Sequence, residues 1–310
     1  MEIFGVFEKM SHNKKLWADV HQASKIYILP NAFTAGNLFF GFLSIILCIQ
    51  GKFNNSSQDR AIDVLAQLIA PTSTNLVEGA GYYLLAILCI LMAFLCDAFD
   101  GRVARASGKL SLFGKEYDSL ADLVSFGVAP CLLMYFLILK PTASMSQALA
   151  SFVINTGWLI GFIFMLCASI RLARFNVLTN PYINGHEKYE TGDFSGLPAP
   201  AAAGTVASIA LTMLSLDLTK FSFVLIPLML LISWFMVGNI PYPSFKHINW
   251  TTSTKFRTFV IIIICVLLII YFREYSFALI FLAYVFYPPV KYIPRLKRAI
   301  QYKIKKIKRK

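Results

Sequence analysis

The chain is poor in charged residues. Asp, Glu, Lys and Arg make up 15% of its 310 residues, whereas they form roughly a quarter of an average soluble protein. Hydrophobic residues make up 57% of the chain, and the mean hydropathy is +0.63. This balance excludes a soluble globular protein and predicts an all-α membrane protein with several spans.

Residues that form disulfides or bind soft metals are also scarce. The six Cys lie in or beside apolar runs without paired spacing, and the four His are isolated from one another. Zinc sites and disulfide frameworks need such residues at short, regular spacings. We therefore expect the cysteines to be small packing residues of a membrane bundle.

Apolar runs, in contrast, are abundant. About eight of them are long enough to cross a bilayer as helices, some only if their ends snorkel or the bilayer is locally thin. One run is rich in Ala, Ser and Thr, which favours close helix packing inside the bundle over contact with lipid. The expected spans are residues 33–50, 80–96, 123–139, 150–170, 201–216, 222–239, 257–272 and 275–289.

Acidic residues are fewer than basic ones, with 16 Asp and Glu and 29 Lys and Arg. The tail 291–310 holds ten Lys or Arg and no acid, which predicts a topology anchor attracted to anionic lipid and not a nucleic-acid site. With an even number of spans, the positive-inside rule places both termini and the loops 97–122, 171–198 and 240–256 in the cytoplasm. Residues 1–28 are expected to form an amphipathic helix at the membrane interface.

The few acids gather at one place. Asp97 and Asp100 end one apolar run, and Asp118 and Asp122 begin the next. On a helix, Asp97 and Asp100 share one face, while Asp118 and Asp122 lie one turn apart. Two neighbouring helices can therefore direct four carboxylates to one point. Acidic groups at the edge of a bilayer usually mark an ion or substrate site.

Four like charges at one point repel one another, and bound divalent cations remove this repulsion. The ligands are all oxygen, which favours Mg²⁺ or Mn²⁺ over zinc. Mg²⁺ is usually bound by protein carboxylates together with the phosphate oxygens of a substrate, so a phosphate-containing substrate is implied. Gly101 and Ala104 place no bulky side chain on the same helix face, so a phosphorylated group could approach the backbone there. The planar guanidinium of Arg105 can bind two phosphate oxygens.

The spacing D-x2-D-G-x2-A-R-x8-G-x3-D-x3-D runs without a gap from Asp97 to Asp122. It resembles the signature of the CDP-alcohol phosphatidyltransferase family, membrane enzymes built on a six-helix core. The likeness continues in the stretches 29–37, 119–130, 171–176, 194–204 and 242–246, which are similar to those of the members that act on serine. It implies transfer of a phosphatidyl group from CDP-diacylglycerol to L-serine, in a homodimer of a prokaryotic cytoplasmic membrane.

The resemblance also implies roles for single residues. Asp97, Asp100 and Asp118 would hold two metal ions, and Asp122 would both contact a metal and accept the proton of the alcohol. The residues expected to bind CDP-diacylglycerol are Asn31, Thr34, Gly101, Ala104, Arg105, Ser111 and Gly114. For Asn31 a helix cap after Pro30 is an equal alternative, and Ser111 could be a plain loop hydroxyl.

Serine needs a cation opposite its carboxylate, and Arg171 and Arg174 lie one turn apart at the cytoplasmic end of the fourth span. Either one is expected to contact serine, unless both are topology charges or bind lipid phosphate. The catalytic domain is expected at 29–246, followed by two additional spans within 247–290. A sibling transferase for glycerol 3-phosphate, inositol or choline is one alternative function, and a divalent-cation transporter is another.

Overall fold

The computed structural model describes residues 28–53, 79–107, 112–138, 147–178, 193–216, 225–243 and 274–307, and the isolated residues 64, 218, 263, 264 and 267. Apart from two three-residue strands and short turns, these residues are helical. The main helices are α2 (Ile28–Phe53), α4 (Ala80–Ser107), α5 (Leu112–Asp122), α7 (Gln147–Leu178), α8 (Ala199–Ser215), α9 (Leu225–Val237) and α11 (Glu274–Ile307).

Four helical segments are long and apolar enough to cross a membrane: Asn31–Phe53, Ala80–Val103, Phe113–Leu137 and Asn155–Leu178. They correspond to the first four expected spans. The fifth and sixth correspond to the shorter apolar helices α8 and α9. Most of 257–272 and the interfacial helix expected at 1–28, except Ile28, lie outside the described residues. The helical membrane fold is thus confirmed, and the count of eight spans stays a prediction.

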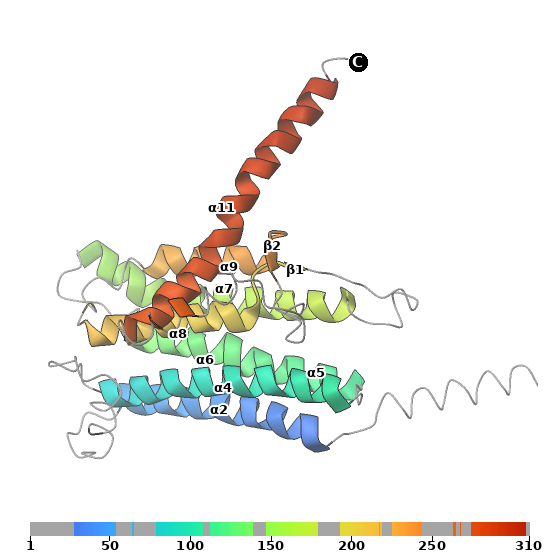
Figure 1. Cartoon of the computed structure of the whole chain (residues 1–310). Coiled ribbons are helices and arrows are strands. Elements are labelled where there is room, and N and C mark those ends of the chain that lie inside the picture. The colour runs from blue at the N-terminus through green and yellow to red at the C-terminus, as the bar shows by residue number, and fades with distance from the viewer. Residues whose placement is uncertain are drawn as a thin grey trace, which may run out of the picture.

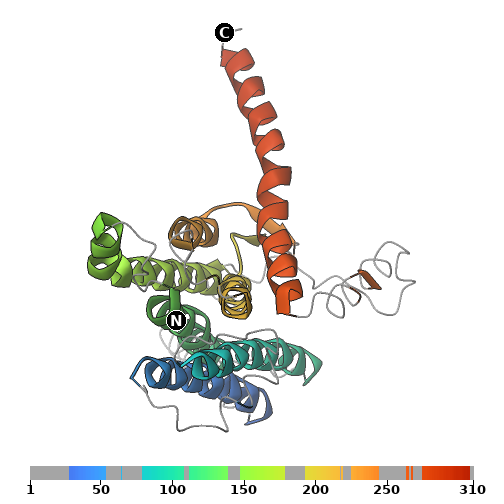
Figure 2. The ribbon, with the colours of Figure 1, turned by 90° about the vertical axis from the view of Figure 1, so that its left-hand side faces the viewer.

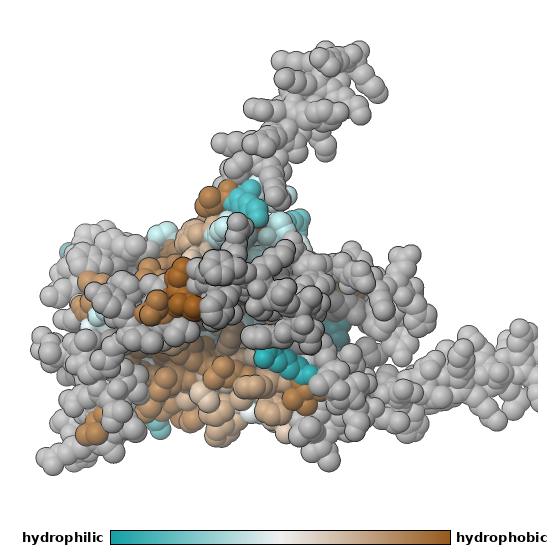
Figure 3. All heavy atoms as spheres, viewed as in Figure 1, coloured by the Kyte–Doolittle hydropathy of each residue, from teal (hydrophilic) through white to brown (hydrophobic). Residues whose placement is uncertain are grey.

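Large hydrophobic side chains cover much of the described exterior. Phe39, Phe42 and Trp158 are each more than half exposed, and Trp234 is 73% exposed. The face of the molecule formed by α2 and α4 is largely hydrophobic (Figure 3). Water would penalise so large an apolar surface, whereas lipid chains solvate it without cost.

The helices form layers around a buried centre. α2 packs along α4, and the third span lies between this pair and the layer of α7, α8 and α9 (Figures 1 and 2). α8 is almost entirely buried, as its small residues predicted. Gly204 of α8 faces the ring of Phe281 in α11 so closely that a Cβ atom there would collide with it. α8 is therefore a packing helix, because small residues let helix backbones approach each other.

The third span is not a regular α-helix. After α5 it continues as η1 (Leu123–Val128), α6 (Ala129–Leu133) and η2 (Met134–Ile138), of which η1 and η2 are π-helical. Segments of π-helix are rare and occur frequently at functional sites. η1 begins directly after Asp122 and packs closely on α2, where a Cβ atom at Gly41 would lie 2.7 Å from the Cα of Ser125.

Short strands bring two distant loops together. β1 (Asp193–Ser195) pairs antiparallel with β2 (Pro241–Pro243), and Phe194 lies opposite Tyr242. Gly196, at a φ of 86°, follows β1 and lets the chain turn into α8, and its N–H donates to the carbonyl of Ile240. The C-terminal ends of α7 and α9 and the start of α8 therefore meet at one end of the bundle, so the described parts of the two expected loops, 171–178, 193–198 and 240–243, lie on one side.

α11 runs unbroken from the expected last span into the basic tail, and its C-terminal part extends away from the bundle (Figures 1 and 2). The helix therefore continues past the boundary expected at residue 290 between the last span and the basic tail. Most residues of 291–307 are compatible with a helix. The hydroxyl of Tyr242 donates to the carbonyl of Val285 at 3.0 Å and so ties β2 to this helix.

Candidate active site

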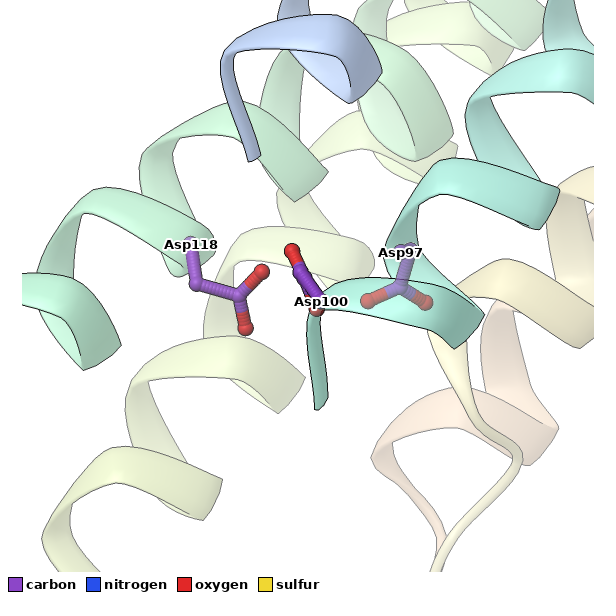
Figure 4. Close-up of side chains that lie close together, drawn as sticks. All are labelled: Asp97, Asp100 and Asp118. Carbon is purple, nitrogen blue, oxygen red and sulfur yellow. The ribbon is translucent and has the colours of Figure 1, made fainter. Parts of the chain in front are cut away.

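Three carboxylates converge between α4 and α5. Asp97 and Asp100 lie on the last part of α4, Asp118 lies on α5, and Figure 4 shows the three side chains pointing toward one another. Each offers an oxygen atom within 4.8 Å of those of the other two. The three-residue step from Asp97 to Asp100 keeps both on one helix face, and α5 then passes that face. A cluster of this kind can hold a divalent cation.

The surroundings of the cluster match a cation that takes oxygen ligands. Asp100 is 6% exposed, and its Oδ2 accepts a hydrogen bond from the hydroxyl of Thr34 at 3.0 Å. Oδ1 of Asp118 is buried and has no hydrogen-bond partner. A buried carboxylate oxygen without a partner, beside two other carboxylates, is costly unless a positive charge is present. The residues therefore fit Mg²⁺ or Mn²⁺.

Asp122, the fourth carboxylate that the sequence predicted at this point, lies outside the group of three, but its charge interacts with those of Asp97 and Asp118. It is 7% exposed, and its Oδ1 accepts a hydrogen bond from Nδ2 of Asn37 at 2.9 Å. One helical turn separates it from Asp118, and α2 contributes the amide that holds it. The carboxylate of Asp122 is thus oriented by a neutral donor.

Asn37 belongs to the site although it was not among the residues predicted from the sequence. Its side chain is fully buried and contacts Asp122, and its backbone carbonyl accepts a hydrogen bond from Ser125 at 2.9 Å. The spacing could have indicated it, because Asn31, Thr34 and Asn37 follow one another at intervals of three. These three polar residues of an apolar helix therefore lie along the side of α2 that faces the carboxylates.

The residues expected to bind the nucleotide lie around the same end of α2, α4 and α5. Asn31 is inside α2, which begins at Ile28, so the alternative role as a helix cap after Pro30 is not supported. Its Nδ2 is buried without a partner. Gly101 lies on α4 and Gly114 on α5. Ala104 and Arg105 continue α4, but their side chains, like the whole of Ser111, lie outside the described residues.

Arg171 approaches the site from α7. It is 8% exposed, and its charge interacts with those of Asp122 and Asp97. Its guanidinium carbon lies 5.6 Å from the ring centroid of Phe175, and Nζ of Lys115 lies 6.0 Å from the same centroid. Two cations from α5 and α7 therefore share one aromatic ring beside the carboxylates.

Arg174 donates hydrogen bonds to backbone carbonyls at the end of the bundle where β1 and β2 pair. It donates to the carbonyls of Ser195 and Val237 at 2.6 and 3.0 Å and to Oδ1 of Asn239 at 3.1 Å. These bonds join α7 to β1 and to the end of α9. Of the two arginines expected near serine, Arg171 interacts with the carboxylates and Arg174 holds the loops.

Asn176 connects α7 to the start of α5. Its Nδ2 donates to Ser119 at 2.9 Å and to Glu116 at 3.1 Å, and its carbonyl accepts from Nζ of Lys115 at 2.9 Å. Ser119 directly follows Asp118 in the chain. The bonds thus set the position of α5, and with it that of Asp118 and Asp122, relative to Arg171.

Known proteins similar to this chain identify its family. The family model for CDP-alcohol phosphatidyltransferase matches residues 27–238, which include every carboxylate described above. A CDP-diacylglycerol–serine O-phosphatidyltransferase of Helicobacter pylori is 30% identical over 77% of this chain and 80% of its own length. An archaetidylserine synthase of Methanothermobacter thermautotrophicus is 33% identical over 73% of both chains. A CDP-diacylglycerol–serine O-phosphatidyltransferase of Saccharomyces cerevisiae is 31% identical over 66% of this chain and 58% of its own. The chain therefore belongs to the CDP-alcohol phosphatidyltransferase family.

Proposed function

We propose that this protein transfers the phosphatidyl group of CDP-diacylglycerol to the hydroxyl of L-serine, which gives phosphatidylserine and CMP. The observation that carries the proposal is the convergence of the Asp97, Asp100 and Asp118 carboxylates beside the oriented carboxylate of Asp122. The names of the relatives support serine as the acceptor. They describe transferases, so they lend no support to a divalent-cation transporter.

Asp97, Asp100 and Asp118 are the residues that would hold Mg²⁺ or Mn²⁺. When bound there, such ions would neutralise the phosphate oxygens of the substrate and make its phosphorus more susceptible to attack. The partnerless Oδ1 of Asp118 and the mutual repulsion of the three carboxylates support this assignment. Thr34 would keep Asp100 in the orientation that directs its second oxygen toward the cluster.

Asp122 is proposed to accept the proton of the serine hydroxyl. The serine oxygen then forms a bond to the phosphorus that carries diacylglycerol, and the anhydride bond to CMP breaks with its electron pair leaving on CMP. The hydrogen bond from Asn37 supports this role, because it presents the carboxylate in one orientation. A positioned general base of this kind contributes about 10²- to 10⁴-fold to the rate.

The nucleotide would lie at the ends of α2, α4 and α5. The amide Nδ2 of Asn31 is a buried donor without a partner, which suits a phosphate or cytidine oxygen. Gly101 on α4 and Gly114 on α5 carry no side chain, which would let the substrate approach the backbone there. Arg105, Ala104 and Ser111 are assigned to the same substrate by the family signature alone.

We place the active site and both termini at the cytoplasmic face of a prokaryotic inner membrane, with the protein as a homodimer. The basic tail and the positively charged loops support this orientation. CDP-diacylglycerol then reaches the site from the inner leaflet, and serine reaches it from the cytoplasm.

The acceptor is tested by measuring CMP release from CDP-diacylglycerol with purified protein and Mg²⁺. L-serine, inositol, glycerol 3-phosphate and choline are compared in parallel. We expect release with serine to be at least about tenfold faster than with any other acceptor. Faster release with another alcohol would assign the protein to a sibling transferase, and metal flux into liposomes without CMP release would support transport.

Arg171 is proposed to bind the carboxylate of serine. Arg171→Lys removes the planar fork, so we expect the apparent KM for serine to rise by about tenfold, with the KM for CDP-diacylglycerol little changed. Arg174→Lys is the matched variant on the same helix and should instead lower thermal stability, because Arg174 bonds to loop carbonyls. An unchanged KM for serine in Arg171→Lys contradicts the assignment.

A further inference from the structure

The amide of Asn37 has one satisfied and one unsatisfied end. Nδ2 donates to Oδ1 of Asp122 at 2.9 Å, while Oδ1 of Asn37 is buried and has no hydrogen-bond partner. The orientation of the amide follows from its partner, because an ionised carboxylate accepts hydrogen bonds and cannot donate them. The unpaired atom is therefore the acceptor, and it lies directly beside the proposed base.

Nothing in the described neighbourhood of α2 explains this acceptor as a packing feature. Asn37 is fully buried in a helix whose other residues are mostly apolar, and a leucine would fill the same volume without a polar atom. A buried acceptor left unpaired costs free energy, so it needs a donor that is present at least during function. The backbone at Asn37 is also held, because Ser125 donates to its carbonyl and Gly41 lets η1 approach.

The donor must come from a molecule that lies against Asp122. Asp122 accepts a hydrogen bond from the Asn37 amide of α2, and its charge interacts with that of Arg171 on α7. It also interacts with the carboxylates of Asp97, Asp100 and Asp118, which are assigned to the metal. An amino-acid alcohol carries three groups around two carbon atoms: a hydroxyl, an ammonium and a carboxylate. The hydroxyl suits Asp122 and the carboxylate suits Arg171, which leaves the ammonium for the acceptor oxygen of Asn37.

We infer that Asn37 selects the ammonium group of the acceptor substrate through Oδ1 while it orients Asp122 through Nδ2. This inference rests on the proposed function, because it assumes that the acceptor is serine. It separates two tasks within one side chain. The donor end positions the base and affects kcat, whereas the acceptor end distinguishes serine from alcohols that lack an ammonium group.

The test uses serine and two analogues that each lack one group. 3-Hydroxypropanoate keeps the hydroxyl and the carboxylate but has no ammonium, and ethanolamine keeps the hydroxyl and the ammonium but has no carboxylate. The value kcat/KM is measured for CMP release with each acceptor. The ratio of serine to 3-hydroxypropanoate is called the ammonium preference, and the ratio of serine to ethanolamine the carboxylate preference.

Asn37→Leu removes both ends of the amide at similar volume. We expect kcat with serine to fall and the ammonium preference to fall by about tenfold to hundredfold, because a hydrogen bond to a charged group is lost. The carboxylate preference should stay within about threefold of the original value, since Arg171 is unchanged. Asn37→Asp keeps an acceptor but loses the donor, so kcat should fall while the ammonium preference is retained.

Ser44→Ala is the matched control. Ser44 is buried on the same helix and donates to the carbonyl of Ala86 at 2.9 Å, so its removal also deletes one buried hydrogen bond. We expect no change in either preference. Retained Mn²⁺ binding in Asn37→Leu shows that the variant is folded.

The outcomes distinguish failure of the proposed function from failure of the role proposed for Asn37. If the original protein releases no CMP with serine, the proposed function fails. If it does, and the ammonium preference of Asn37→Leu is unchanged, Asn37 only orients Asp122 and the inference is overturned. Loss of the ammonium preference in Asn37→Leu together with its retention in Asn37→Asp supports the inference.

Discussion

Asp122→Asn is expected to lower kcat by about 10²- to 10⁴-fold, the range that a positioned general base contributes. An asparagine has the same shape, and its oxygen can still accept the hydrogen bond from Nδ2 of Asn37. The geometry of the site therefore survives, but the side chain can no longer take a proton. Single-turnover release of CMP from CDP-diacylglycerol with saturating serine measures the effect.

The apparent KM for CDP-diacylglycerol should stay within about threefold of the original value, because the proposed role of Asp122 concerns the acceptor. Glu116→Gln is the control for the loss of one negative charge. Glu116 lies on the same helix and accepts a hydrogen bond from Asn176 at 3.1 Å, which a glutamine can also accept. Activity of Asp122→Asn at the parental rate would remove Asp122 from the mechanism.

Asp118→Asn is expected to weaken metal binding by at least about a hundredfold. Even partners of metal ligands change affinity by about 10- to 100-fold, and Asp118 is proposed as a direct ligand with a buried, partnerless oxygen. Direct binding of Mn²⁺ to the purified protein, followed by electron paramagnetic resonance, measures this without relying on turnover. The Mg²⁺ concentration needed for half-maximal activity should rise in parallel.

Removal of the metal with a chelator should abolish CMP release, and added Mg²⁺ or Mn²⁺ should restore it. The Asp118→Asn protein should regain part of its activity at high metal concentration, because Asp97 and Asp100 remain. Glu116→Gln again serves as the control, with unchanged Mn²⁺ affinity expected. Equal Mn²⁺ affinity in Asp118→Asn and the original protein would show that the three carboxylates do not form the metal site.

The two changes separate binding of the ion from activation of the alcohol. Asp118 belongs to the convergent group of three carboxylates, whereas Asp122 is bound to Asn37 of α2. This arrangement predicts that Asp122→Asn lowers kcat and leaves the metal affinity unchanged. Asp118→Asn should instead lower the metal affinity, with part of its activity restored at high metal concentration. If both substitutions changed only kcat, or both changed only the metal affinity, Asp118 and Asp122 would share one role.

Much of the fold could be predicted from hydropathy. The spans at 33–50 and 80–96 lie within α2 and α4, because a long apolar run in lipid must satisfy its backbone internally and so forms a helix. The buried position of α8 followed from its small residues. The π-helical turns after Asp122 could not be predicted, because an apolar run has the same hydropathy whether its turns are α- or π-helical.

The spacing from Asp97 to Asp122 was enough to predict a cluster of carboxylates, since it places them on two successive helix faces regardless of what surrounds them. Tertiary structure alone decided how they divide: which three converge, that Asn37 holds the fourth, and that Arg171 interacts with the carboxylates while Arg174 bonds to loops. The physical reason is that helical periodicity is local, whereas these contacts join α2, α5 and α7 and depend on how the helices pack against one another.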